Sequence, residues 1–255
     1  MSPRRLHAVL IALPLLVALA APAGATTLDP GSRASSEVSA PVPTRTAATR
    51  VRLDGVTVAV PADGSQVVTV NHTTGHRARV SLWRRDATGW HRIARTVAGR
   101  TGYGGLVAAR LRKQATGTTP LGTFRLLSSF GTHPTQPGAA LPHRTIEHGD
   151  FWVEDNRSAY YNRYRNKAEG GFRWRLPQSA ADSSERLSDF PKQYEYAIVT
   201  SFNYAAQVRH RGAGIFLHVN GSGATAGCVS APRWFLQRAL AVLDPARHPV
   251  IAIGR

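Results

Sequence analysis

Cys228 and His218 are the two side chains of the 255-residue chain whose types and spacing point to covalent chemistry. Cys228 is the only cysteine, and His218 lies ten positions before it, after the apolar run Ile215–Leu217. A thiol together with an imidazole is the smallest set that makes a cysteine nucleophile and its base. The alternative is structural, because a lone cysteine is commonly a small buried apolar residue and a lone histidine commonly packs or caps.

The elements around these two residues suit a nucleophile. Ile215–Leu217 is typical of a short buried strand, which would carry His218 at its end. Asn220–Gly223 has the composition of a turn, so the chain can double back before Cys228. Gly227 has no side chain, so a substrate carbonyl can approach the thiol, and the backbone N–H groups of Gly227 and Cys228 are candidates for an oxyanion hole.

A helix is predicted directly after the cysteine. Ser230 is the expected N-cap, Pro232 stands in the first turn, and the helix continues through Trp234–Leu243. A thiol just before a helix N-terminus experiences a positive potential, which favours the thiolate. We therefore expect the pKa of Cys228 to lie below that of a free thiol.

Two segments of the chain match motifs of a known family. His218, a loop and Thr225–Cys228 match a strand ending in histidine followed by Ser/Thr-x-Gly-Cys. Thr119–Phe124 matches a Thr-Pro-x-Gly-x-Phe segment. On these residues the chain resembles the L,D-transpeptidase catalytic-domain (YkuD-like) family, in an exported subgroup of actinobacterial type.

The resemblance implies a fold and a reaction. The fold would be mainly β with a few helices, an L,D-transpeptidase-like β-sandwich or barrel with a helix after the catalytic cysteine. Cys228 would attack a peptidoglycan stem tetrapeptide, release D-alanine and pass the acyl group to an amine of another stem, giving a 3-3 cross-link. His218 would act as general base and acid, and the backbone carbonyl of Val219 would hold its second ring nitrogen. No metal and no organic cofactor is implied.

The resemblance also implies a substrate groove. Its expected residues are Thr119, Gly122, Phe124, Tyr161, Asn162, Asn220, Thr225 and Ser230. Trp152, in the same aromatic segment as Tyr161, is expected in the core. The chain departs from the family where Ala226 replaces a common second histidine and Ser230 a common Arg or Asn, and the interval between His218 and Cys228 is short. These departures leave the acceptor and the balance between transfer and hydrolysis open.

The first 25 residues have the pattern of a secretory signal peptide, with Arg4 and Arg5, the apolar run Ala8–Ala21 and the small residues Ala23–Ala25. We expect residues 26–50 to be a disordered linker, because they are rich in Ser, Thr, Ala and Pro. Residues 51–255 would form the catalytic domain. The mature protein is expected outside the cytoplasm, secreted or in the cell wall, as a monomer without a membrane anchor.

The chain is strongly basic. Its formal charge of +17 falls to +15 without residues 1–25, which contain Arg4 and Arg5 and no acid. Cationic exported proteins bind polyanions, and anionic cell-wall polymers are the expected partner. Nucleic acid is not expected, because neither a zinc-ligand cluster nor a helix-turn-helix pattern is present. Many arginines are scattered, so the charge has an alternative origin in a GC-rich genome.

Outside the segment around Cys228, residue patterns predict strands and loops. Alternation and turn signals predict strands at 56–60, 66–70, 78–84, 90–94, 123–127, 194–204 and 250–253. Gly99–Gly105 is expected to be a surface loop, because the Lys-Ser/Thr of a phosphate loop does not follow it. The polar segment Ala168–Ser188 predicts a long loop or lid.

Other functions remain open from the sequence. A hydrolase would use the same residues and give the acyl group to water. A non-catalytic wall-binding protein would use the basic surface alone, and a metalloenzyme would need a further ligand beside His218 and Cys228. A glycosidase would need Glu154 and Asp155 as paired carboxylates, but adjacent residues on a strand point to opposite faces.

Overall fold

A computed structural model describes residues 48–255. The expected signal peptide and most of the expected linker lie outside the described residues. The first strand begins at Thr49, so the last two residues of the expected linker belong to a strand. No helix in residues 48–255 is both long and apolar enough to cross a membrane.

The described part of the chain is built mostly from strands. The strands are β1 (Thr49–Leu53), β2 (Val56–Val60), β3 (Gln66–His72), β4 (Arg77–Asp86), β5 (Gly89–Arg100), β6 (Leu106–Ala108), β7 (Thr119–Gly131), β8 (His143–Thr145), β9 (Asp150–Trp152), β10 (Tyr164–Asn166), β11 (Glu185–Arg186), β12 (Ala197–Thr200), β13 (Phe216–Val219), β14 (Val229–Ala231) and β15 (Val250–Gly254). The helices are α1 (Arg233–Val242) and the short 3-10 turns η1 (Ala109–Leu111), η2 (Lys167–Glu169), η3 (Leu187–Asp189), η4 (Gln193–Glu195) and η5 (Pro245–Arg247).

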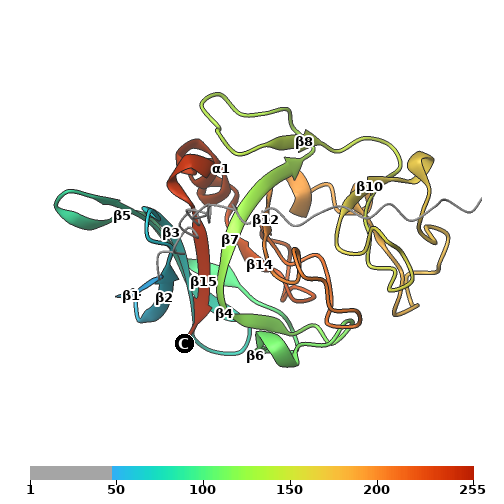
Figure 1. The fold of residues 1–255 in the computed structure, drawn as a ribbon, viewed down its shortest axis with the longest axis horizontal. Helices are drawn as coiled ribbons and strands as arrows, with labels where there is room; N and C mark the ends of the chain where they lie inside the picture. The colour runs from blue at the N-terminus through green and yellow to red at the C-terminus, as the bar shows by residue number, and fades with distance from the viewer. Residues whose placement is uncertain (1–47) are drawn as a thin grey trace, which may run out of the picture. The chain divides into compact units, whose positions relative to one another are not determined.

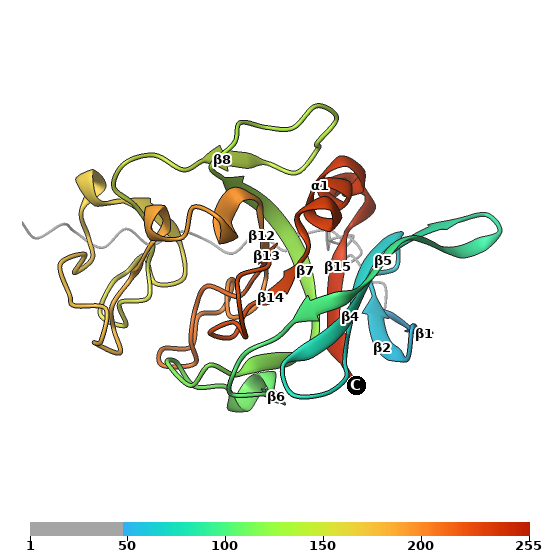
Figure 2. The same ribbon diagram turned by 180° about the vertical axis from the view of Figure 1, so that it is seen from behind.

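The main sheet closes into a barrel (Figures 1 and 2). β12, β13, β14, β5, β4, β3, β15 and β7 follow one another as paired neighbours, and β7 also pairs with β12. The antiparallel run β3–β4–β5 is the predicted meander, in which the turn at Asp86–Gly89 joins β4 to β5. The predicted mainly β fold with a barrel is confirmed.

The alternation of side chains along the strands separates the inside of the barrel from its outside. Leu217 and Val219 of β13 point inward and join the main core, together with Ile198 of β12. The apolar face of α1, centred on Phe235 and Leu236, packs onto the same core. Phe216, which alternates with Leu217, lies instead in a second cluster outside the barrel. His218 shares the outer face with Phe216.

The second cluster covers the outer face of β7, β12 and β13. It is rich in aromatic side chains, with Phe130 in edge-to-face contact with Phe216 at 5.0 Å between ring centroids. Trp152 belongs to it and is 3 % exposed, as expected for a core residue. The segment drawn in yellow, which contains the small sheet β10–β9–β11, lies on this side of the barrel in both views (Figures 1 and 2).

Two predicted elements differ from the observed ones. The strand expected at 194–204 is limited to β12, because η4 occupies Gln193–Glu195. The strand expected at 123–127 is part of the longer strand β7, which also includes Pro120 and Gly122. Gly122 has a φ of +135° and pairs with Ile253 of β15, so its glycine character allows a local distortion inside the sheet.

Candidate active site

A cavity of about 550 Å³ opens outside the barrel, next to the second aromatic cluster. Cys228 and His218 both line it, so the fold brings together the two residues that the sequence singled out. Its walls come from segments that are distant in the chain, and they include Tyr103, Arg112, Glu154, Trp174, Glu185, Phe190, Tyr194 and residues 221–226.

Parallel pairing of β13 with β14 places the two reactive residues on the same face of the sheet, in diagonal positions on neighbouring segments. His218 lies opposite Ser230 in this register, and Cys228 immediately precedes β14. Because Val229 points into the core, Cys228 and Ser230 have the opposite, outward orientation. Cys228 is 9 % and His218 7 % exposed, so each shows only a small part of its surface to the cavity.

The imidazole of His218 is held by its neighbour. Its Nδ1–H donates to the carbonyl of Val219 at 2.8 Å, which is the contact that the resemblance implied. This bond fixes the proton on Nδ1 and leaves Nε2 as the acceptor nitrogen. Nε2 has no hydrogen-bond partner among residues 48–255. Every completely enclosed side-chain nitrogen or oxygen in this range has a partner, so Nε2 is not completely enclosed and reaches the cavity. Burial lowers the pKa of His218 to about 4, so the ring is neutral at pH 7.

The thiol of Cys228 is also neutral, contrary to the sequence prediction. Its Sγ–H donates to the carbonyl of Gly214 at 3.1 Å, and Sγ accepts from the N–H of Phe216 at 3.3 Å. Burial, and to a smaller extent the negative charge of Glu185, raises the pKa of Cys228 above its ordinary value. The predicted lowering was wrong.

The expected helix does not begin where the prediction placed it. β14 separates Cys228 from α1, which begins at Arg233 after Pro232 as the capping position. The positive potential of a helix N-terminus acts mainly within the first turn, and the thiol lies outside that turn. Ser230 is not an N-cap and not a groove residue, because it is completely buried in β14 and its hydroxyl donates to Asn220 Oδ1 at 2.7 Å.

One of the two expected oxyanion donors is already used. The N–H of Gly227 donates to Thr225 Oγ1 at 3.2 Å, and the Thr225 hydroxyl donates to the Cys228 carbonyl at 2.6 Å. The N–H of Cys228 has no acceptor within residues 48–255, so it is the candidate donor that stays available. Gly227 has a φ of +131°, which explains why glycine stands there.

The glycine-rich segment around Gly102 supports the cysteine loop from behind and is not the plain surface loop that was expected. Gly102 pairs with Thr225, and the N–H of Tyr103 donates to the Thr225 carbonyl at 2.9 Å. A Cβ on Gly102 would lie 2.0 Å from the Gly117 carbonyl oxygen and 3.0 Å from the Gly227 Cα. The loop that carries Cys228 is thus fixed by a close backbone approach.

The Thr-Pro-x-Gly-x-Phe segment does not line the cavity, so its expected groove role is corrected. Thr119 is completely buried, and its hydroxyl accepts from the Gly102 N–H at 2.8 Å. Gly122 lies within the barrel wall. Phe124 packs edge-to-face on Phe202 at 5.6 Å. The segment acts behind the site, through Gly102.

Tyr161 and Asn162 are likewise structural and not part of the groove. Tyr161 is fully buried, and its hydroxyl donates to Gln114 Oε1 at 2.8 Å. Asn162 is 2 % exposed, and its Oδ1 accepts from Trp152 Nε1 at 2.8 Å. The N–H of Asn162 donates to the Val153 carbonyl at 2.7 Å, so the chain returns to the end of β9 at this point.

The turn residue Asn220 is also turned away from the cavity. Its Nδ2 donates to the Ala98 carbonyl at 2.8 Å, which ties the turn to β5. The residues that follow it, 221–226, do line the cavity. Of the groove residues that the resemblance implied, Thr225 is the one that the structure places there.

Sequence reasoning missed the acidic and basic side chains that line the cavity beside His218, which are Arg112, Glu154, Glu185, Arg186 and Asp189. Burial raises the pKa of Glu154 to about 8. Burial also raises the pKa of Glu185 to about 7, against the hydrogen bond from the Tyr194 hydroxyl at 2.6 Å. The signal available in the sequence was the position of Glu154 directly after the apolar run Phe151–Val153.

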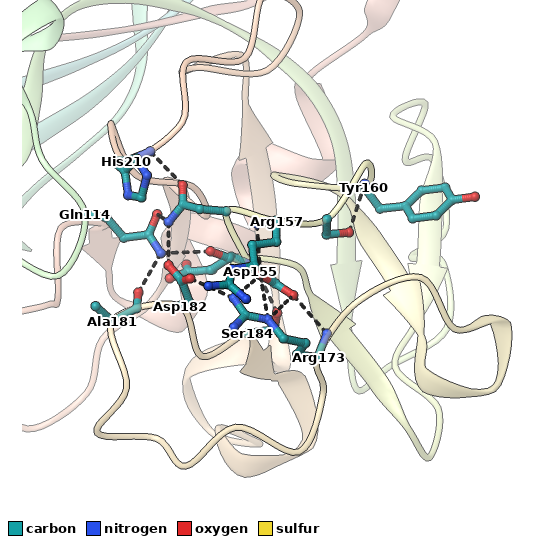
Figure 3. Close-up of polar contacts among 12 residues, drawn as sticks. Gln114, Asp155, Arg157, Tyr160, Arg173, Ala181, Asp182, Ser184 and His210 are labelled. Atoms are coloured by element: carbon teal, nitrogen blue, oxygen red, sulfur yellow. Dashed lines mark hydrogen bonds and ion pairs between the residues drawn. The ribbon is translucent and has the colours of Figure 1, made fainter.

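A polar network fixes the wall segment that was expected to be a long loop or lid. Figure 3 shows Arg173 between Asp155 and Asp182, with an Arg173–Asp182 distance of 2.7 Å. Gln114 Nε2 donates to the Ala181 carbonyl at 2.7 Å and joins this wall to the η1 side of the cavity. The segment has little regular structure, as expected, but its ion pairs hold it in place.

No group of three or more His, Cys, Asp or Glu side chains in residues 48–255 is arranged to hold a metal ion. What the site offers is a thiol, a neutral imidazole with a free nitrogen, and a free N–H on the cysteine. No curated protein and no solved structure shows a significant match to the chain. The family model of the L,D-transpeptidase catalytic domain (YkuD) matches residues 65–251, which contain the barrel, the cavity and both reactive residues. The chain belongs to the L,D-transpeptidase catalytic-domain family.

Proposed function

We propose that the protein is an exported cysteine L,D-transpeptidase that acts on peptidoglycan stem peptides. The observation that carries this proposal is the meeting of the single cysteine with a histidine of fixed tautomer in one cavity. The family supports the substrate class. Cell-wall localisation, a monomeric state and contact with anionic wall polymers are part of the proposal and follow from the N-terminal pattern and the charge of +17.

The first half of the reaction forms a thioester. On substrate binding the Cys228 thiol turns from the Gly214 carbonyl toward Nε2 of His218, which takes the proton as sulfur attacks the carbonyl of the third stem residue. The oxyanion accepts from the N–H of Cys228. The C–N bond then breaks, and the imidazolium gives its proton to the departing amine of D-alanine.

The second half reverses these roles. A neutral side-chain amine of another stem attacks the thioester, His218 takes a proton from it, and the thiolate leaves. The imidazolium then returns the proton to sulfur, so the enzyme ends in its starting state. Water in place of the amine would make the protein a carboxypeptidase, which is the alternative on the same residues.

Intact-protein mass spectrometry tests the proposal. The protein is mixed with a purified disaccharide-tetrapeptide, with Cys228→Ala as the matched control, and the soluble products are analysed. We expect a covalent adduct that lacks D-alanine, its absence in the variant, and a 3-3 dimer in solution. An adduct followed only by tripeptide would establish the hydrolase. No adduct and no D-alanine release would leave a non-catalytic wall-binding protein.

A further inference from the structure

One basic and one acidic side chain approach the thiol, each against a glycine. A Cβ on Gly227, the residue before Cys228, would lie 2.8 Å from Arg112 Nη2. A Cβ on Gly214, whose carbonyl accepts from the thiol, would lie 2.9 Å from Glu154 Oε1. Both glycines have positive φ, at +131° and +62°, so the bare backbone leaves room for a charge on either side of the sulfur.

Arg112 is buried but incompletely paired. It is 6 % exposed, its Nε donates to the Thr118 carbonyl at 2.8 Å and its Nη1 to the Arg211 carbonyl at 3.0 Å. Nη2 has no hydrogen-bond partner in residues 48–255. Every completely enclosed side-chain nitrogen in this range has a partner, so Nη2 is not completely enclosed and reaches the cavity that Arg112 lines. Two carbonyls therefore fix the guanidinium and direct one N–H edge at the space beside the thiol.

Glu154 has a fixed backbone and an unbonded carboxyl group. Its N–H donates to Ser184 Oγ at 3.1 Å and its carbonyl accepts from Gln114 Nε2 at 2.8 Å. Neither carboxyl oxygen has a hydrogen bond or an ion pair with any described residue, and Arg112 forms no salt bridge with it. Glu185, the other glutamate of the cavity, already accepts from Tyr194.

The basic and the acidic group do not neutralise one another in the free protein. Burial removes hydration from both, direct pairing is absent, and below a pH of about 8 Glu154 keeps its proton because burial raises its pKa. A ligand that carries both charges would satisfy both groups at once. Nη2 of Arg112 lies against Gly227 and the carboxyl group of Glu154 against Gly214, so the two ends of such a ligand are also oriented. The ammonium of the ligand would favour the ionised form of Glu154, because an opposite charge nearby lowers the pKa of a carboxyl group.

We propose that Arg112 and Glu154 form a subsite for a free amino-acid group, in which one carbon carries both an ammonium and a carboxylate. Arg112 takes the carboxylate and Glu154 the ammonium. The identity of the biological ligand rests on the proposed function, because the amino-acid group would belong to the donor stem peptide or to the acceptor. A ligand with an ammonium alone leaves Arg112 unsatisfied, and this makes the subsite selective.

Binding of small probes to the Cys228→Ala protein tests the subsite without catalysis. The probes are meso-diaminopimelate, with an amino-acid group at each end, cadaverine, which lacks its carboxylates, and pimelate, which lacks its amines. Affinities are measured by NMR titration. We expect meso-diaminopimelate to bind about 10- to 100-fold more tightly than either probe, the effect of losing one charge-assisted hydrogen-bonded group.

Matched variants assign the preference to residues. Glu154→Gln and Arg112→Lys should reduce it to a few-fold, whereas Glu147→Gln and Arg110→Lys, changes of exposed residues, should keep it. Because Arg112 also holds two carbonyls, the stability of each variant is measured by thermal unfolding. If Arg112→Lys does not fold, the result with Glu154→Gln alone tests the proposed subsite. Equal affinities for the three probes, or a preference that survives Glu154→Gln, would overturn the proposal.

Two sources of the amino-acid group are distinguished by kinetics on the protein with Cys228 intact. If the amino-acid group is the side-chain end of the donor's diamino acid, Glu154→Gln slows acyl-enzyme formation by about 10- to 100-fold. This slowing occurs only with a donor whose diamino acid carries that amino-acid group. If the group belongs to the acceptor, acylation stays unchanged and the share of thioester transferred to amine falls. Unchanged acylation and transfer would contradict the subsite. A failure of wild-type Cys228 to acylate would refute the proposed function, while the probe titration still reports on the subsite.

Discussion

Replacing Glu154 by glutamine should stabilise the protein at alkaline pH. Burial raises the pKa of this carboxyl from its ordinary 4.5 to about 8, while the positive charge of Arg112 acts in the opposite direction. In the window from 4.5 to 8 the folded state holds a proton that the unfolded state has lost, so the free energy of unfolding falls as pH rises. Each unit corresponds to ~1.4 kcal/mol, which sets an upper limit of about 5 kcal/mol above pH 8.

Because Glu154 is partly open to the cavity, we expect about 2–5 kcal/mol of this difference to be measured. The assay is urea unfolding of wild type, Glu154→Gln and Glu147→Gln at intervals from pH 4 to pH 9. The gain of Glu154→Gln over wild type should be near zero at pH 4.5 and grow steadily to pH 9, while Glu147→Gln follows wild type. A stability difference between Glu154→Gln and wild type that is the same at every pH would refute the reasoning. It would mean that the pKa of Glu154 is the same in the folded and the unfolded protein.

Four further outcomes follow from the site. The stability of wild type relative to His218→Gln should fall by about 2–3 kcal/mol as pH falls from 6.5 to 4, because burial lowers the pKa of His218 to about 4; urea unfolding of both proteins measures the difference. Iodoacetamide alkylation of Cys228 should rise at higher pH than that of free cysteine, since burial raises its pKa, and a profile at or below that of free cysteine would contradict this. Gly102→Ala should lower stability by about 3 kcal/mol or more in thermal unfolding, because its Cβ would lie 2.0 Å from a carbonyl oxygen. Tyr161→Phe should cost about 1–3 kcal/mol through its two lost hydrogen bonds and leave the kinetics of acylation unchanged.

The parts of the structure that could be predicted are those that depend on local pattern. The strands expected at 56–60, 66–70, 78–84 and 250–253 agree within two residues at each end with β2, β3, β4 and β15, whereas β5, expected at 90–94, extends to Arg100. The meeting of Cys228 with His218 was predicted from two short motifs. The bond from His218 to the Val219 carbonyl is equally local, since it joins adjacent residues.

The parts that could not be predicted depend on long-range packing. Val229–Ala231 carries no signal that separates a strand from the start of a helix, and its parallel pairing with β13 decides the matter. That pairing moves the thiol away from the helix N-terminus, and burial then raises the pKa of Cys228. Arg112 and Glu154 reach the cavity from segments that lie more than sixty residues before the cysteine, so no spacing rule connects them with it.

The neutral state of both reactive groups has a consequence for how the site works. A thiolate–imidazolium pair would be reactive at all times, because the thiolate is the form that alkylating agents and oxidants attack. Here desolvation disfavours both the thiolate and the imidazolium. At pH 7 the thiol therefore keeps its proton and donates to the Gly214 carbonyl, while Nε2 of His218 is unprotonated and has no hydrogen-bond partner among the described residues. Proton transfer becomes favourable only when sulfur attacks a carbonyl, since the charge then moves to an oxyanion that the Cys228 N–H can stabilise. Arg112, beside Gly227, adds a fixed positive charge on the same side. The arrangement therefore couples activation of the nucleophile to the presence of the substrate carbonyl.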